Sequence, residues 1–216
     1  MVARFMPTGV RNAVKLIAVL REPIARELSL FNHERWSGFD WSGGSSTCSA
    51  SKLPSFEAYA GCQVAIYGTL NATQNDDDTQ RKIYQNLGFG LWKGMYIIHL
   101  ATWRRSFDRN RVFVMSYDNL KPEDKMATDI AKFLDLYPFN RSVWFPVRND
   151  HTFAAKQRTI TCAIRDDLQA IFQPWNDLLY KKLQEDQDGR TAPQTEPPFP
   201  DFRLHPCVPN GSSSSS

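Results

Sequence analysis

A short apolar run that is followed at once by an arginine and a proline constrains the fold of this chain most. Five consecutive apolar residues, Leu16 to Leu20, are typical of a strand that is covered on both faces of a parallel sheet. Pro23 suits the first position of a helix, where a backbone N–H is not needed. Ligands in open α/β sheets bind beyond the carboxyl ends of strands, and helix N-termini attract anions. We therefore predict that Arg21 stands at a phosphate-binding position.

The remaining periodic segments indicate that strand followed by helix occurs twice. This order favours an α/β fold with a parallel sheet flanked by helices. A solvated loop is expected from Asn71 to Gln80. The other expected elements are a helix from Pro23 to about Trp36, a helix from about Gly90 to Phe107, a strand from Arg111 to Tyr117, a helix that opens at Pro122, and a last helix from about Arg165 to Leu183.

Length and composition describe one domain with a real core. The chain has 216 residues, and an apolar content of 42% with six tryptophans argues against global disorder. The net charge of +3 is weak, and no basic run suggests a nucleic acid partner. No apolar stretch approaches the roughly 18 residues that a membrane span needs. We expect a domain over residues 1–184 and a Pro- and Ser-rich, flexible tail over residues 185–216.

The cysteines and glycosylation sequons bear on the compartment. The four cysteines have no metal-ligand spacing, so no metal site is expected. Cys48 and Cys62 lie in one polar region, and a disulfide between them is plausible in an oxidising compartment. Three N-x-Ser/Thr sequons fit a secretory route; they begin at Asn71, Asn140 and Asn210.

The spacing of the residues after the first strand resembles a known binding segment. Arg21-x-Pro23-x-x-Arg26-x-x-Ser29, directly after Lys-Leu-Ile-Ala-Val-Leu, is similar to the 3′-phosphate-binding segment of the sulfotransferases. The likeness is closest to the Golgi carbohydrate branch, which includes the heparan sulfate sulfotransferases. It implies that Arg21 and Ser29 bind the 3′-phosphate of the sulfuryl donor, 3′-phosphoadenosine 5′-phosphosulfate. The alternative is that Arg21 and Arg26 are ordinary surface charges at a strand–helix junction.

Three further segments resemble the same family in the same order. They are Gly90 to Phe107, Arg111 to Leu136, and the loop Ala155 to Thr159 with the helix that follows it. The resemblance covers roughly residues 8–183 and implies a P-loop-like sulfotransferase fold. The family usually has Lys-Gly-Arg in the last loop, where it closes over the donor nucleotide.

In this chain Lys156 and Arg158 match that loop motif, and Gln157 replaces its glycine. The resemblance therefore implies that Lys156, Gln157 and Arg158 belong to the cofactor site. A glutamine there is a strained choice if the loop needs a positive φ. Read without the resemblance, Lys156 and Arg158 are solvated loop charges.

Several side chains of the Gly90–Phe107 segment permit two interpretations. Aromatic faces stack on sugars, so Trp92, Tyr96 and Trp103 would suit an acceptor groove, but their helical spacing favours core. His99 is interpreted as a packing residue rather than a base, because apolar neighbours flank it. The cations of this segment are interpreted as solvated; they are Lys93, Arg104 and Arg105.

The resemblance also shows what is missing. In the family, a Lys- and Thr-rich loop near the N-terminus holds the 5′-phosphosulfate, and a catalytic glutamate or histidine follows it. No such loop precedes residue 15, so the fold is expected to be N-terminally incomplete, and no catalytic residue is identifiable.

Taken with the resemblance, the sequence gives a ranked set of functions. The first is a sulfotransferase that moves a sulfuryl group from 3′-phosphoadenosine 5′-phosphosulfate to a hydroxyl or amine of a glycan or glycosaminoglycan, without a metal. It would act in the Golgi lumen or secretory pathway, with a membrane anchor outside this sequence. The second is an inactive fragment that retains 3′-phosphonucleotide binding or an interaction role. The third is an unrelated α/β interaction protein.

Overall fold

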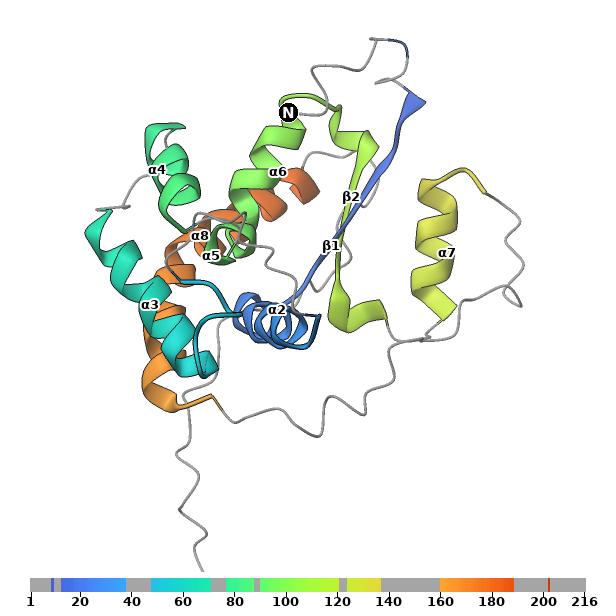
Figure 1. Ribbon diagram of the computed structural model, residues 1–216. Coiled ribbons are helices and arrows are strands. Elements are labelled where there is room, and N and C mark those ends of the chain that lie inside the picture. Colours follow the sequence, from blue (N-terminus) through green and yellow to red (C-terminus); the bar gives the residue numbers. More distant parts are fainter. Residues whose placement is uncertain are drawn as a thin grey trace, which may run out of the picture.

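The computed structural model describes residues 9, 13–37, 48–70, 77–87, 90–120, 124–136, 160–188 and 202. This part of the chain is mostly helical with a small parallel sheet, so the fold is α/β (Figure 1). The elements in order are β1 (Leu16–Leu20), α2 (Pro23–Ser37), α3 (Phe56–Thr69), α4 (Asp77–Leu87), α5 (Gly90–Gly94), α6 (Tyr96–Arg104), η2 (Arg109–Arg111), β2 (Val112–Ser116), η3 (Tyr117–Leu120), α7 (Asp124–Phe133) and α8 (Cys162–Asp188).

The two strands expected from the sequence form, and they pair in parallel. Their register runs from Leu16 opposite Val112 to Leu20 opposite Ser116. The expectation that the first strand is covered on both faces is wrong, because Ile17 and Val19 are 37% and 44% exposed. The reason is that α7, which stands apart from the other helices (Figure 1), packs against β2.

The main core lies on the other side of the sheet. There α8 packs against α2, α3 and α6, and α5 packs against α2. The approach of α5 to α8 is close: a Cβ added to Gly94 would lie 2.7 Å from the Phe172 ring. The largest fully buried apolar side chains of this core are Phe56, Phe172, Ile24, Ile83, Leu87, Leu91, Met95, Leu168 and Leu179.

Several helix boundaries differ from the sequence prediction, and α8 in particular runs from Cys162 to Asp188, several residues beyond the expected Arg165 to Leu183. Residues 90–107 were expected to form one helix, but the chain leaves the helical conformation at Met95, where φ is −82° and ψ is 67°. This break separates α5 from α6. Helix α4 begins at Asp77, inside the segment expected to be loop. Acidic residues are stable in the first turn of a helix because they interact well with its dipole, so an acidic run is a poor loop signal.

A disulfide near α3 and a buried phenylalanine late in the chain complete the described structure. A disulfide joins Cys48 to Cys62, so the chain before α3 is tied to that helix; Cys162 is also disulfide-bonded. Phe202 is buried and lies near the rings of Tyr96 and Tyr180. No helix in the described ranges is both long and apolar enough to cross a membrane.

Candidate functional site

The carboxyl ends of β1 and β2 lie together, and Arg21 is the first residue beyond β1. Its guanidinium carbon lies 5.0 Å from the ring centre of Tyr117, the first residue beyond β2. Its carbonyl oxygen accepts a 2.7 Å hydrogen bond from the Tyr96 hydroxyl of α6. Burial, the largest influence, raises the pKa of Tyr96 to about 12, so the hydroxyl stays protonated as a donor. The Arg21 backbone is therefore fixed by α6, and its side chain lies against an exposed aromatic face.

The N-terminus of α2 is already occupied by a carboxylate. The two oxygens of Glu22 accept hydrogen bonds from the backbone N–H groups of Ile24 and Ala25, at 2.8 and 2.6 Å. Burial raises the pKa of Glu22 although these bonds and the Arg165 charge act in the opposite direction. These two amides therefore already have a carboxylate partner, and the prediction that Arg21 binds a phosphate stays a prediction. A phosphate at this edge would depend on the Arg21 guanidinium.

Arg26 has a structural role in a buried polar cluster. It lies 2.7 Å from the fully buried carboxylate of Glu27, which also accepts a 3.1 Å hydrogen bond from the Tyr59 hydroxyl. Burial raises the pKa of Glu27, and the Arg26 charge partly offsets this. The alternative of an ordinary surface charge is thus wrong for Arg26. A Cβ on Gly90 would lie 2.9 Å from the Tyr59 hydroxyl oxygen, so a larger residue there would push the ends of Tyr59 and Gln63 out of place.

The other predicted cofactor residues are not joined to Arg21 by any contact within the described ranges. Ser29 is exposed on α2, eight residues after Arg21, and no hydrogen bond of the described residues joins the two side chains. Its role therefore stays a prediction. Lys156, Gln157 and Arg158 lie outside the described residues, so the prediction that they close over a nucleotide also stays a prediction.

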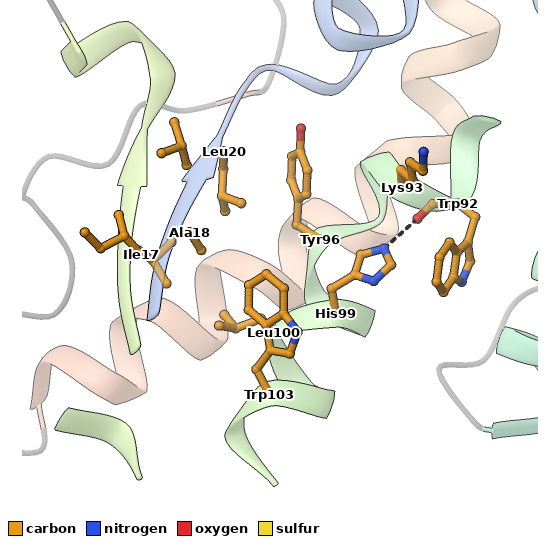
Figure 2. Close-up of a pocket in the computed structure, with 11 residues that line it drawn as sticks. Ile17, Ala18, Leu20, Trp92, Lys93, Tyr96, His99, Leu100 and Trp103 are labelled. Carbon is orange, nitrogen blue, oxygen red and sulfur yellow. Dashed lines mark hydrogen bonds between the residues drawn. The ribbon is translucent and has the colours of Figure 1, made fainter. Parts of the chain in front are cut away.

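A groove of about 400 Å³ lies beside β1 (Figure 2). One wall is the sheet, with Ile17 to Leu20 of β1 and Val114 of β2. The opposite wall comes from α5 and α6, and Figure 2 shows the side chains of Tyr96, His99 and Trp103 in the space beside the strand. The alternative interpretation of Trp92, Tyr96 and Trp103 as groove residues agrees with this lining, because all three residues contribute to it.

The aromatic residues of α5 and α6 divide between core and groove. Tyr96 is buried, as the core interpretation predicts. Trp103 is 38% exposed, so the core interpretation is wrong for this residue. Trp92 is half-buried, and its indole N–H is enclosed without a hydrogen-bond partner in the structure.

His99 has a packing role. Its Nε2 lies 3.2 Å from the carbonyl oxygen of Trp92, and its ring meets the Trp92 ring edge-on at 4.2 Å. Burial lowers the pKa of His99, and the charges of Arg26 and Lys93 lower it further. His99 is therefore neutral at pH 7. Burial also lowers the pKa of Lys93, which lines the groove beside it, so Lys93 is not the fully solvated charge that was expected.

Neither a group of metal ligands among the described residues nor a similar known protein was found for this chain. The described ranges contain no group of three or more His, Cys, Asp or Glu side chains that would hold a metal ion. No known family model and no curated protein matches the chain.

Proposed function

We propose that the chain is part of a carbohydrate sulfotransferase, with a P-loop-like sulfotransferase fold, and that Arg21 binds the 3′-phosphate of 3′-phosphoadenosine 5′-phosphosulfate. One observation carries the proposal: Arg21 follows a parallel strand at the sheet edge where α/β proteins bind ligands, and its side chain lies across Tyr117 at the end of the neighbouring strand. The order of four motifs that resemble this family supports the same conclusion.

The chemistry of Arg21 suits a phosphate. A guanidinium offers paired N–H donors that match two phosphate oxygens, and it remains charged at every physiological pH. The Tyr117 ring restrains the side chain, so less conformational entropy is lost when the phosphate binds. The exposed Ser29 hydroxyl is available as a second donor, and by resemblance Lys156 and Arg158 would add charge from the loop before α8.

Transfer of the sulfuryl group needs more than this half of a donor site. The acceptor hydroxyl or amine attacks sulfur, the sulfur–oxygen bond to adenosine 3′,5′-bisphosphate breaks, and a base takes the acceptor proton. Cationic donors must stabilise the charge that develops on the leaving phosphate. No residue of this chain is assigned either task, so we propose that transfer requires a 5′-phosphosulfate loop supplied by further sequence. The second candidate is nucleotide binding without transfer.

The disulfide supports the proposed compartment. A bond between Cys48 and Cys62 persists in oxidising surroundings and is rare in a reducing cytosol. Together with the sequons, this favours the Golgi lumen or another part of the secretory pathway, where glycan and glycosaminoglycan acceptors are sulfated.

Calorimetry with two nucleotides tests the binding step. Adenosine 3′,5′-bisphosphate should bind more tightly than adenosine 5′-monophosphate, which lacks the 3′-phosphate. Arg21→Ala should weaken the bisphosphate complex about 10- to 100-fold and Ser29→Ala about 3- to 10-fold, the range for lost charged and neutral hydrogen bonds. Arg81→Ala, which removes an exposed arginine of α4, is the matched control. Equal affinity for both nucleotides, or equal effects of Arg21→Ala and Arg81→Ala, would reject the proposal.

A transfer assay separates the two candidate functions. The purified chain, a sulfur-labelled donor and mixed glycosaminoglycans should give little labelled product, because the groups that act on the reacting sulfur are not identified here. Robust transfer that Arg21→Ala abolishes would show that the chain contains a complete catalytic apparatus, and the requirement for further sequence would then be wrong.

A further inference from the structure

The first turn of α8 carries a cation that no contact of the described residues explains. Arg165 is the fourth residue of α8; it is half-buried, and its Nε atom is enclosed without a hydrogen-bond partner. Within the described residues its guanidinium forms no ion pair, although the exposed Asp166 and Asp167 follow it directly. Enclosing a charged group without a partner is costly, so its presence here calls for a reason.

The place of Arg165 in α8 is unfavourable for a cation. The N-terminus of a helix carries a partial positive charge, so acidic side chains stabilise the first turn and basic ones do not. The first turn of α8 contains no acidic residue to offset the charge of Arg165. An anion beside this turn would be attracted by the guanidinium and by the helix together. The helix position and the enclosed Nε therefore both point to an anionic ligand.

Arg165 and Arg21 share a neighbour, the carboxylate of Glu22. Helix α8 packs against α2, and Glu22 directly follows Arg21 at the start of α2. Burial is the largest influence on the pKa of Glu22 and raises it; two backbone hydrogen bonds, the charge of Arg165 and the charge of Arg21 lower it, in that order. Arg165 therefore acts on this carboxylate more strongly than the arginine next to it in sequence. Two cations from distant parts of the chain lie around one point at the carboxyl end of β1.

Glu22 does not account for Arg165 by itself. Its two oxygens accept hydrogen bonds from the backbone N–H groups of Ile24 and Ala25, and within the described residues it forms no ion pair with Arg165. A phosphate monoester has three terminal oxygens and up to two negative charges. Guanidinium groups match such oxygens with paired N–H donors, so one phosphate suits two arginines at once.

We propose that Arg165 is a second phosphate-binding residue, which holds the 3′-phosphate of the nucleotide together with Arg21. This inference rests on the proposed function and adds a residue to its donor site. Arg21 contributes its charge from the end of β1, and Arg165 contributes from the first turn of α8. The bound phosphate then joins the sheet to the last helix. The sequence motifs did not single out Arg165, because the donor-site resemblance lies in the loop before α8.

A nucleotide series identifies the phosphate that Arg165 binds. Calorimetry compares adenosine 3′-monophosphate, adenosine 5′-monophosphate and adenosine 3′,5′-bisphosphate. Arg165→Met keeps much of the apolar stem and should weaken the two nucleotides that carry a 3′-phosphate about 10- to 100-fold, with the 5′-monophosphate unchanged. Arg165→Lys should recover part of the affinity, because it restores the charge without the paired donors. Lys181→Met, which removes an exposed cation nearer the other end of α8, is the matched control and should change none of the three.

Thermal unfolding separates a binding role from a structural one. Without nucleotide, Arg165→Met should unfold at the same temperature as the wild type or a higher one, because the substitution removes a cation from a helix N-terminus. With adenosine 3′,5′-bisphosphate, the unfolding temperature of the wild type should rise more than that of the variant. A lower unfolding temperature for Arg165→Met with unchanged nucleotide affinity would mean that Arg165 only supports Glu22, and the inference would be wrong.

Failure of this inference and failure of the proposed function give different results. If Arg21→Ala weakens the 3′-phosphate nucleotides and Arg165→Met does not, the proposed function stands and the inference is wrong. If Arg165→Met weakens the 5′-monophosphate as much as the 3′-monophosphate, Arg165 does not distinguish the 3′-phosphate, and the inference is again wrong. If the wild type binds both monophosphates equally, or binds no nucleotide, the proposed function fails and the inference fails with it.

Discussion

The two strands of the sheet have similar sequences and different surroundings. Leu16–Leu20 and Val112–Ser116 are both short and apolar, and they pair residue by residue. Every residue of β2 is buried, whereas β1 alternates between buried and exposed positions. The difference arises because the main core and α7 cover β2 on both faces, while only the core side of β1 is covered. An apolar run therefore identifies a strand without telling whether it is central or at an edge.

The largest expected effect comes from truncating equivalent positions in the two strands. Phe113 and Ile17 are opposite each other in the register, and Phe113 packs against Phe133 of α7 with ring centres 5.3 Å apart. Phe113→Ala should lower the free energy of unfolding by about 3–5 kcal/mol, and Ile17→Ala by less than about 1 kcal/mol. Urea denaturation of both variants measures this. Equal losses would mean that β1 is as well covered as β2.

A smaller loss of stability is expected when the contact of Lys15, the residue before β1, with the end of α7 is removed. The Lys15 ammonium donates a 2.6 Å hydrogen bond to the Phe133 carbonyl and forms an ion pair with Asp135. Lys15→Met keeps much of the apolar stem and should lower the free energy of unfolding by about 1 kcal/mol, part of it sensitive to salt. Lys82→Met removes an exposed pair with Asp78 on α4 and should cost less. Equal losses of unfolding free energy in both variants would mean that the Lys15 contacts do not stabilise the packing of α7 on β2.

The smallest expected effect on stability appears only at acid pH and comes from His99 in the groove beside β1. Because the folded chain lowers the pKa of His99, the unfolded chain binds its proton more readily. The stability that neutral His99 contributes is present above the unfolded pKa, about 6.5, and is lost as pH falls through the folded pKa. His99→Gln should therefore flatten the dependence of unfolding free energy on pH between 8 and 5.

The control for this measurement is His33→Gln, which replaces an exposed histidine of α2. Glu22 and Glu27 act in the opposite sense: since burial raises each pKa, their contribution is fully present below the unfolded value and declines as pH rises through the folded pKa. Subtracting the unfolding free energy of each variant from that of the wild type at each pH removes the contribution of these two glutamates. Identical pH curves for His99→Gln and wild type would mean that the groove holds a protonated histidine without strain.

The sequence predicts the elements of this fold better than their surroundings. The apolar runs identify both strands, and Pro23 marks the first residue of α2, because these signals act locally. The break at Met95 escapes prediction since the apolar spacing continues across it. The exposure of Val19 escapes it as well, because coverage depends on where α7 packs after the chain has folded.

The candidate site was predicted in part for the same reason. The position of Arg21 at the end of a parallel strand follows from the local order of strand, arginine and proline. The capping role of Glu22 was missed, although an acidic residue directly before a helix-starting proline is a usable signal for it. The contact with Tyr117 joins residues 96 positions apart, and no local pattern reports such a contact.

The parallel register of the sheet has a consequence for synthesis of the chain. Val112, the partner of Leu16, lies 96 residues later in the sequence. At a translation rate of about 5–20 residues per second, β1 waits roughly 5–20 s before its partner strand is made. During that interval the helices α2 to α6 can form from local contacts, whereas β1 still lacks β2, the strand with which it pairs in the described residues. Binding by a chaperone at this stage would protect β1 from aggregation until β2 emerges.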